Sequence, residues 1–275
     1  MTEYGSLKSI LQKGGKAHPF WILGPCVLET SETVNQIAET ICQIRDDHKL
    51  NIVFKASFDK ANRTSIHSKR GPGLEEGLKT LSHIKSQYKL PILTDVHDVS
   101  QVSAAAEVAD ILQVPAFLSR QTDLLVAVAQ SGRPVNVKKG QFLSPENVRQ
   151  IGEKLIQNGC QDYWITERGV SFGYGKLIVD FSGFHIMENL GADIIFDCTH
   201  SVQAPAVETS TTGGIREAIP DLARGAAAVG VKGFFGETHP HPEDAWSDAS
   251  NAWPLPRLEE LVLQTMQVAF AAHGD

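Results

Sequence analysis

Four cationic side chains stand at or just beyond the ends of strand-like runs in this sequence. They are Lys55, Lys60, Lys138 and Arg168. A lysine inside a folded domain loses much hydration energy unless it meets an anion. The simplest such anion is an acid of the chain itself, with the candidates Asp59, Asp95 and Glu167. Convergence of all four cations on one mouth would instead favour an anionic ligand that carries a phosphate and a carboxylate, with Arg168 supplying a bidentate contact.

A second group has the chemistry of metal ligands: Cys26, His200, Glu237 and Asp248. These residues are far apart, so no spacing motif indicates a metal. They follow the first, seventh and eighth strand-like runs, which would be neighbours around a closed barrel. A mixed sulfur, nitrogen and oxygen set suits Zn²⁺, Fe²⁺ or Mn²⁺ better than Mg²⁺ or Ca²⁺. The alternative for Cys26 is a small buried hydrophobic residue.

Eight units of a strand followed by a helix would be needed to bring these groups together. The strand-like runs are 20–24, 52–57, 91–95, 110–114, 135–138, 163–167, 193–197 and 232–237. The helical patterns are 32–48, 73–87, 99–107, 121–130, 145–158, 181–190, 215–229 and 257–272. This alternation predicts a parallel (β/α)₈ TIM barrel, an α/β fold, with an open doubly wound sheet as the alternative. A barrel collects reactive groups at the carboxyl ends of its strands. We expect one domain over 1–275, with 1–18 as a short N-terminal extension.

The amino-acid composition argues against several classes of protein. The 275 residues are 42% hydrophobic and carry a formal net charge of −7, which leaves no basic field for nucleic acid or an anionic membrane. A membrane-spanning helix needs about 18 consecutive apolar residues, and the sequence contains no such run. The opening residues lack the pattern of a signal peptide. Four scattered cysteines are too few for a disulfide framework. We therefore expect a cytoplasmic protein.

Several sequence strings resemble one family over nearly the whole chain, the 3-deoxy-D-manno-octulosonate-8-phosphate synthases. The strings are GPCVLE (24–29), FKASFDKANRTS (54–65), RGPG (70–73), TDVH (94–97), QVPAFL (113–118), VKKGQ (137–141), TERG (166–169) and THSVQ (199–203). The related 3-deoxy-7-phosphoheptulonate synthases, which use erythrose 4-phosphate, usually read Lys-Pro-Arg-Thr where this chain has Lys-Ala-Asn-Arg. They are the weaker alternative.

The resemblance implies a homotetrameric transferase of lipopolysaccharide synthesis. It would condense phosphoenolpyruvate with D-arabinose 5-phosphate and water to give 3-deoxy-D-manno-octulosonate 8-phosphate and phosphate. It also implies the metal-requiring class, in which Cys26, His200, Glu237 and Asp248 would bind the divalent ion. His200, Asp248, Lys138 and Lys60 would be the catalytic residues.

The resemblance further implies a set of substrate contacts. Lys60, Lys138 and Arg168 would hold phosphoenolpyruvate, in a pocket completed by Lys55, Ser57 and Gln113. Asn62, Arg63 and Thr64 would meet the sugar phosphate, and Phe117 and Arg120 would reach in from a neighbouring subunit. Asp95 and Gln203 are the remaining candidate substrate-binding residues.

Three other functions are open from the residues alone. A Schiff-base aldolase would use a barrel lysine such as Lys138 as nucleophile. A metal-dependent hydrolase would need several His ligands at one end of the barrel, and only His200 and His239 are candidates. A non-catalytic sugar-phosphate binding protein would need no metal.

Overall fold

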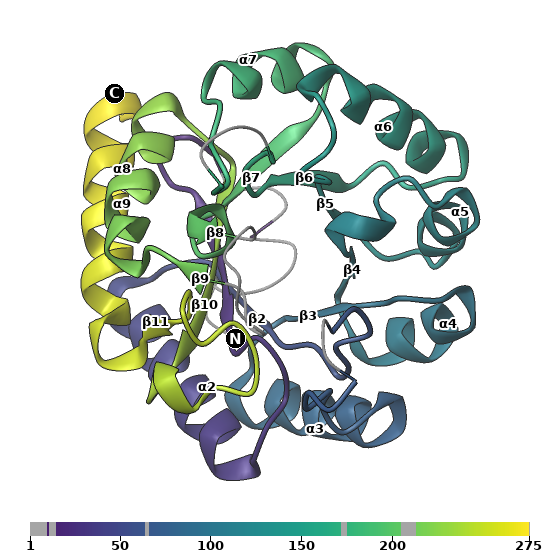
Figure 1. Cartoon of the computed structure of the whole chain (residues 1–275), viewed down its shortest axis with the longest axis vertical. Coiled ribbons are helices and arrows are strands. Elements are labelled where there is room, and N and C mark those ends of the chain that lie inside the picture. The colour runs from purple at the N-terminus through teal and green to yellow at the C-terminus, as the bar shows by residue number, and fades with distance from the viewer. Residues whose placement is uncertain (1–9, 11–14, 64–65, 172–174, 205–212, 275) are drawn as a thin grey trace.

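The computed structural model describes residues 10, 15–63, 66–171, 175–204 and 213–274. In this part of the chain, eight parallel strands form a closed barrel, with eight α-helices packed around it (Figure 1). The strands of the barrel are β1 (Phe20–Gly24), β2 (Ile52–Lys55), β3 (Ile92–Asp95), β4 (Ile111–Val114), β5 (Val135–Lys138), β6 (Tyr163–Glu167), β7 (Asp193–Asp197) and β10 (Gly233–His239). Closure comes from the parallel pairing of β1 with β10, in which Phe20 lies opposite Gly233 and Gly24 opposite Glu237. The predicted TIM barrel is therefore confirmed, and the open sheet is excluded.

The helices follow their strands as the sequence pattern predicts. They are α2 (Ser31–His48), α3 (Leu74–Tyr88), α4 (Val99–Val108), α5 (Thr122–Gln130), α6 (Val148–Gln157), α7 (Ser182–Asn189), α8 (Ile219–Val229) and α9 (Leu258–His273). Short 3₁₀ turns precede or follow several of them, at Ala116–Leu118, Pro145–Asn147, His200–Val202, Arg216–Ala218, Pro242–Asp244 and Leu255–Arg257. Thr30 caps α2, because its hydroxyl accepts from the backbone N–H of Thr33 at 3.2 Å.

Three short strands were not predicted from the sequence. β8 (Gln203–Ala204) pairs antiparallel with β9 (Gly213–Gly214), and β11 (Trp253–Pro254) extends the barrel sheet beside β10. All three lie in the connections after β7 and β10, on the same side of the barrel as the carboxyl ends of those strands. They shape the loops at the barrel mouth.

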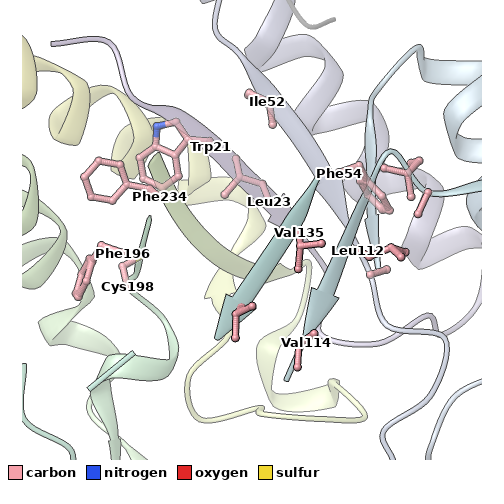
Figure 2. Close-up of a cluster of buried hydrophobic side chains, with 14 of the residues drawn as sticks. Trp21, Leu23, Ile52, Phe54, Leu112, Val114, Val135, Phe196, Cys198 and Phe234 are labelled. Atoms are coloured by element: carbon pink, nitrogen blue, oxygen red, sulfur yellow. The ribbon is translucent and has the colours of Figure 1, made fainter. Parts of the chain in front are cut away.

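Two apolar layers hold the strands in place. The larger lies between the barrel and the helices, where Trp21, Phe54, Phe196 and Phe234 pack outward (Figure 2). The smaller fills the barrel interior and includes Phe20 and Phe235. Ile10, from the predicted N-terminal extension, is fully buried in this inner layer. Because both faces of each strand are covered, nearly every strand residue is buried.

Gly24 shows how tightly the mouth is built. A Cβ at this position would lie 1.9 Å from the carbonyl oxygen of Lys55, so only glycine allows the end of β1 to approach β2 this closely. This approach places Cys26 and Lys55 beside each other. None of the helices in the described part of the chain is long and apolar enough to cross a membrane.

Candidate active site

A cavity of about 340 Å³ opens at the carboxyl ends of the strands. Thirteen of the predicted site residues line it: Lys55, Lys60, Asn62, Arg63, Asp95, Gln113, Phe117, Lys138, Arg168, His200, Gln203, Glu237 and Asp248. Ser57 and Cys26 are buried beside them. The structure thus brings residues from all parts of the chain into one pocket.

The lining of this cavity includes Lys60, Lys138 and Arg168, which we name the cationic wall. The ammonium group of Lys138 lies 3.1 Å from the centre of the Phe235 ring and forms an ion pair with Asp197. Burial lowers the pKa of Lys138 to about 8, although the nearby charge of Asp197 opposes that shift. Lys138 is therefore a cation at neutral pH that holds its proton less firmly than an ordinary lysine.

Arg168 has an unused hydrogen-bond donor. Its Nη2 donates to Gln203 Oε1 at 2.5 Å, whereas the buried Nη1 has no hydrogen-bond partner among the described residues. A buried guanidinium N–H without an acceptor is costly. Because Arg168 lines the cavity, an anionic ligand there would satisfy this donor.

The three acids that the sequence offered as partners of the cations, Asp59, Asp95 and Glu167, are engaged elsewhere. Asp59 pairs with Arg70 at 2.5 Å, Asp95 accepts from Ser57 Oγ at 2.6 Å and lies 3.1 Å from His97, and Glu167 pairs with Lys139 at 3.2 Å. Pairing with these three acids is therefore not seen, but two of the four cations do meet other acids of the chain: Lys138 pairs with Asp197, and Lys55 with Glu237 at 2.6 Å.

Beside the cationic wall lie Cys26, Glu237 and Asp248, which we name the ligand cluster, and the charge of Lys60 acts on all three. Their ligating atoms all lie within 4.8 Å of one another, and Cys26 Sγ donates to Asp248 Oδ2 at 3.1 Å. His200, the fourth predicted ligand, is adjacent, with its Nε2 3.6 Å from Glu237 Oε2. Three of the four predicted ligands are thus gathered, and the fourth borders them.

The charges of the ligand cluster are those of a cation site. Burial, together with the charge of Glu237, raises the pKa of the Cys26 thiol well above its ordinary value. Burial acts to raise the pKa of Glu237 as well, but the charges of Lys55 and His200 outweigh it, so that the pKa is lowered. Asp248 adopts a left-handed backbone conformation, with φ of 52°, which an aspartate adopts at some cost. A buried thiol beside two carboxylates and an imidazole fits a divalent transition metal, which would displace the thiol proton and neutralise the clustered acids.

The predicted sugar-phosphate residues lie at the rim. Arg63 donates from Nη1 to Ser247 Oγ at 2.7 Å, from Nη2 to the Trp246 carbonyl at 2.6 Å, and from Nε to the Lys69 carbonyl at 3.0 Å. Phe117 is 55% exposed at the mouth, while Arg120 is exposed and is not among the residues that line the cavity. Thr64 lies outside the described residues.

Some cavity residues were not predicted as site residues. They are His97, Pro115, Ala116, Gln141, Asp197, Phe235 and Ser247. Asp197 and His97 do stand at strand ends, which is a signal that could have identified them. Phe235 belongs to an apolar run, and only the two-residue alternation of β10 indicates that it faces the barrel interior.

The fold and cavity define a class: a TIM-barrel protein whose cavity brings buried cationic side chains beside a buried cluster of a thiol and carboxylates. Residues 6–271 match the DAHP synthetase I family, and the chain belongs to that family. A relative from Desulfatibacillum aliphaticivorans, named 2-dehydro-3-deoxyphosphooctonate aldolase, is 50% identical over 272 residues, which cover 99% of this chain and all of the relative. A relative of the same name from Xanthomonas campestris pv. campestris (strain B100) is 48% identical over 249 residues, 90% of each chain. These relatives agree with the resemblance seen in the sequence strings and do not favour the heptulosonate alternative.

Proposed function

We propose that this chain condenses phosphoenolpyruvate with D-arabinose 5-phosphate and water, releasing phosphate and 3-deoxy-D-manno-octulosonate 8-phosphate. This is the reaction of 3-deoxy-D-manno-octulosonate-8-phosphate synthase, another name for the activity that the relatives' names print. One observation carries the proposal: an unsatisfied Arg168 and a buried Lys138 line a cavity that also borders a thiol–carboxylate cluster. That arrangement suits an anionic enol phosphate held beside a polarised carbonyl.

The cationic wall would hold phosphoenolpyruvate. Lys138 and Arg168 would bind its phosphate and carboxylate, and Lys60 would complete the charge balance. Holding two anionic substrates together in a reactive orientation is a large part of the barrier. The cations offset the repulsion between the two phosphates, and Arg63 and Asn62 at the rim would hold the phosphate of the sugar.

In the reaction, C3 of the enol phosphate attacks the aldehyde carbon, and water adds at C2. The C2–O bond then breaks, so phosphate leaves with the bridging oxygen. His200 and Asp248 would carry protons at the aldehyde oxygen or at the attacking water. Zn²⁺, Fe²⁺ or Mn²⁺, held by Cys26, His200, Glu237 and Asp248, would supply Lewis acidity when bound.

We also propose a homotetramer of single-domain subunits in the cytoplasm. Phe117 supports the oligomer, because this large apolar side chain is more than half exposed at the mouth, where a second subunit would cover it. Light scattering of the purified protein tests this: a mass of one subunit would contradict it.

The experiment that tests the activity measures phosphate release from phosphoenolpyruvate with two aldoses. We expect release with arabinose 5-phosphate and little with erythrose 4-phosphate. Phosphoenolpyruvate carrying ¹⁸O at the bridging position should yield phosphate that contains the label. Preference for erythrose 4-phosphate would overturn the substrate assignment, and unlabelled phosphate would overturn the C–O cleavage. A Schiff-base route would be indicated by a stable adduct at Lys138 after borohydride treatment with substrate.

A further inference from the structure

Asp197, at the end of β7, lines the cavity and is fully buried. Its Oδ1 accepts three hydrogen bonds, from the backbone N–H groups of Thr199 at 3.1 Å and His200 at 2.9 Å and from the Thr199 hydroxyl at 3.1 Å. These bonds fix the plane of the carboxylate. Its other oxygen, Oδ2, is therefore aimed in a set direction.

Asp197 Oδ2 contacts both Lys138 and His200. It accepts from the ammonium group of Lys138 on the cationic wall, and it lies 2.7 Å from Nδ1 of His200. Nδ1 has no hydrogen-bond partner among the described residues, so its 2.7 Å contact with Asp197 Oδ2 is an ion-pair distance without hydrogen-bond geometry. The single oxygen thus contacts one substrate-binding candidate and one metal-ligand candidate.

The second ring nitrogen of His200 faces the ligand cluster, with Nε2 3.6 Å from Glu237 Oε2. An imidazole that donates from Nδ1 to a carboxylate keeps its lone pair on Nε2, which is the form that binds a metal. A fixed carboxylate 2.7 Å from Nδ1 would therefore favour the tautomer with the proton on Nδ1 and restrict the orientation of the ring.

We infer that Asp197 is a positioning residue that sets His200 for metal ligation through Nε2, and that also holds Lys138 against the Phe235 ring. The inference rests on the metal centre of the proposed function. It assigns to one carboxylate a link between the metal side and the substrate side of the pocket.

The substitution Asp197→Asn separates this role from packing. The amide is the same size, but its NH₂ group would face Nδ1 of His200, which would then have to act as acceptor and leave the proton on Nε2. Glu167→Gln is the matched control, because Glu167 is also a buried strand-end carboxylate paired with a lysine, Lys139 at 3.2 Å, and that lysine is fully buried outside the cavity lining.

The measurement is the dissociation constant of Zn²⁺, by competition with a chromophoric chelator on the substrate-free full chain. We expect Asp197→Asn to bind Zn²⁺ about 10–100-fold more weakly than the wild type, while Glu167→Gln stays within about twofold. Cobalt-loaded Asp197→Asn should also lose intensity in its d–d bands relative to cobalt-loaded wild type. Equal Zn²⁺ affinity of Asp197→Asn and wild type would overturn the inference and leave the metal centre standing. A wild-type chain that binds no Zn²⁺, Fe²⁺ or Mn²⁺ would remove the metal centre itself.

A second measurement needs no folded variant of Asp197. Nitrogen NMR of the wild-type chain with labelled histidine, assigned with His200→Gln, reports the tautomer of His200 directly. We expect the proton on Nδ1 before and after addition of Zn²⁺. A proton on Nε2 in the metal-free protein would overturn the inference.

Discussion

The ligand cluster and the cationic wall differ in how far their polar groups are hydrogen-bonded. In the ligand cluster, Asp248 accepts from Cys26 Sγ, from Gln203 Nε2 at 3.0 Å and from Ser247 Oγ at 2.9 Å, and Glu237 accepts from Lys55 at 2.6 Å. On the cationic wall, Arg168 retains a buried N–H without an acceptor among the described residues. Under the proposed function, the packed acceptors lie where a cation would bind and the unmatched donor lies where an anion would bind.

Removal of the metal from the ligand cluster should cause the largest loss of activity. Incubation with a strong chelator, or the substitution Cys26→Ser, should lower kcat by about 10²-fold or more, because loss of Lewis acidity costs several kcal/mol of transition-state stabilisation. Zn²⁺, Mn²⁺ or Fe²⁺ should restore the chelated wild type. Full turnover after demonstrated removal of all metal would contradict this.

Arg168→Ala should give the next largest effect, on the cationic side. Loss of a charge-assisted contact of about 1.5–3 kcal/mol predicts a fall of about 10–100-fold in kcat/KM for phosphoenolpyruvate. Metal affinity should not change, and this is the control that separates the two sides. A similar fall caused by Arg168→Lys would show that the planar guanidinium is required. Unchanged kcat/KM for Arg168→Ala would remove this residue from the substrate site.

Arg63→Ala tests whether Arg63 binds the sugar phosphate and not phosphoenolpyruvate. We expect the KM for arabinose 5-phosphate to rise about tenfold, the value of one charged contact, with a much smaller change for phosphoenolpyruvate. Steady-state kinetics with each substrate varied in turn gives both values. Equal changes in both KM values would mean that Arg63 acts through its contacts with Trp246 and Ser247 rather than on the sugar phosphate.

A change of pH should give the smallest effect. Lys138 binds an anion only while protonated, so its contribution is complete below its pKa of about 8 and is lost as pH rises through that value. We expect kcat/KM for phosphoenolpyruvate to be halved near pH 8 and to fall about tenfold by pH 9. An arginine at position 138 stays charged over this range, so the pH profile of kcat/KM for Lys138→Arg should lack the fall between pH 8 and pH 9. A fall retained in that variant would assign the titration to another group.

The sequence predicts the barrel well because its signal is local. Each of the eight barrel strands begins and ends within about two residues of a predicted run, since apolar and β-branched residues cluster at every buried strand. β8, β9 and β11 were missed because a strand of two residues has no periodicity to detect.

The pairing of side chains in the site could not be predicted. Lys55 bonds to Glu237 across 182 positions and Lys138 to Asp197 across 59, and only the closed barrel brings them together. For the same reason the ligand cluster has no spacing motif, and the family resemblance was needed to favour a metal there. The adjacent residues Lys138 and Lys139 show the role of alternation, because one faces the cavity and the other is buried outside its lining against Glu167.

The burial of Ile10 has a consequence for how substrates enter and products leave during the catalytic cycle. Ile10 is buried together with Phe20 and other apolar residues in the interior of the barrel, so apolar side chains of the described residues fill that interior, and the cavity has its outlet at the carboxyl ends of the strands. Substrates, water, phosphate and the sugar acid must share that outlet. A product that lingers therefore obstructs the following cycle, and each product should compete with substrates for entry.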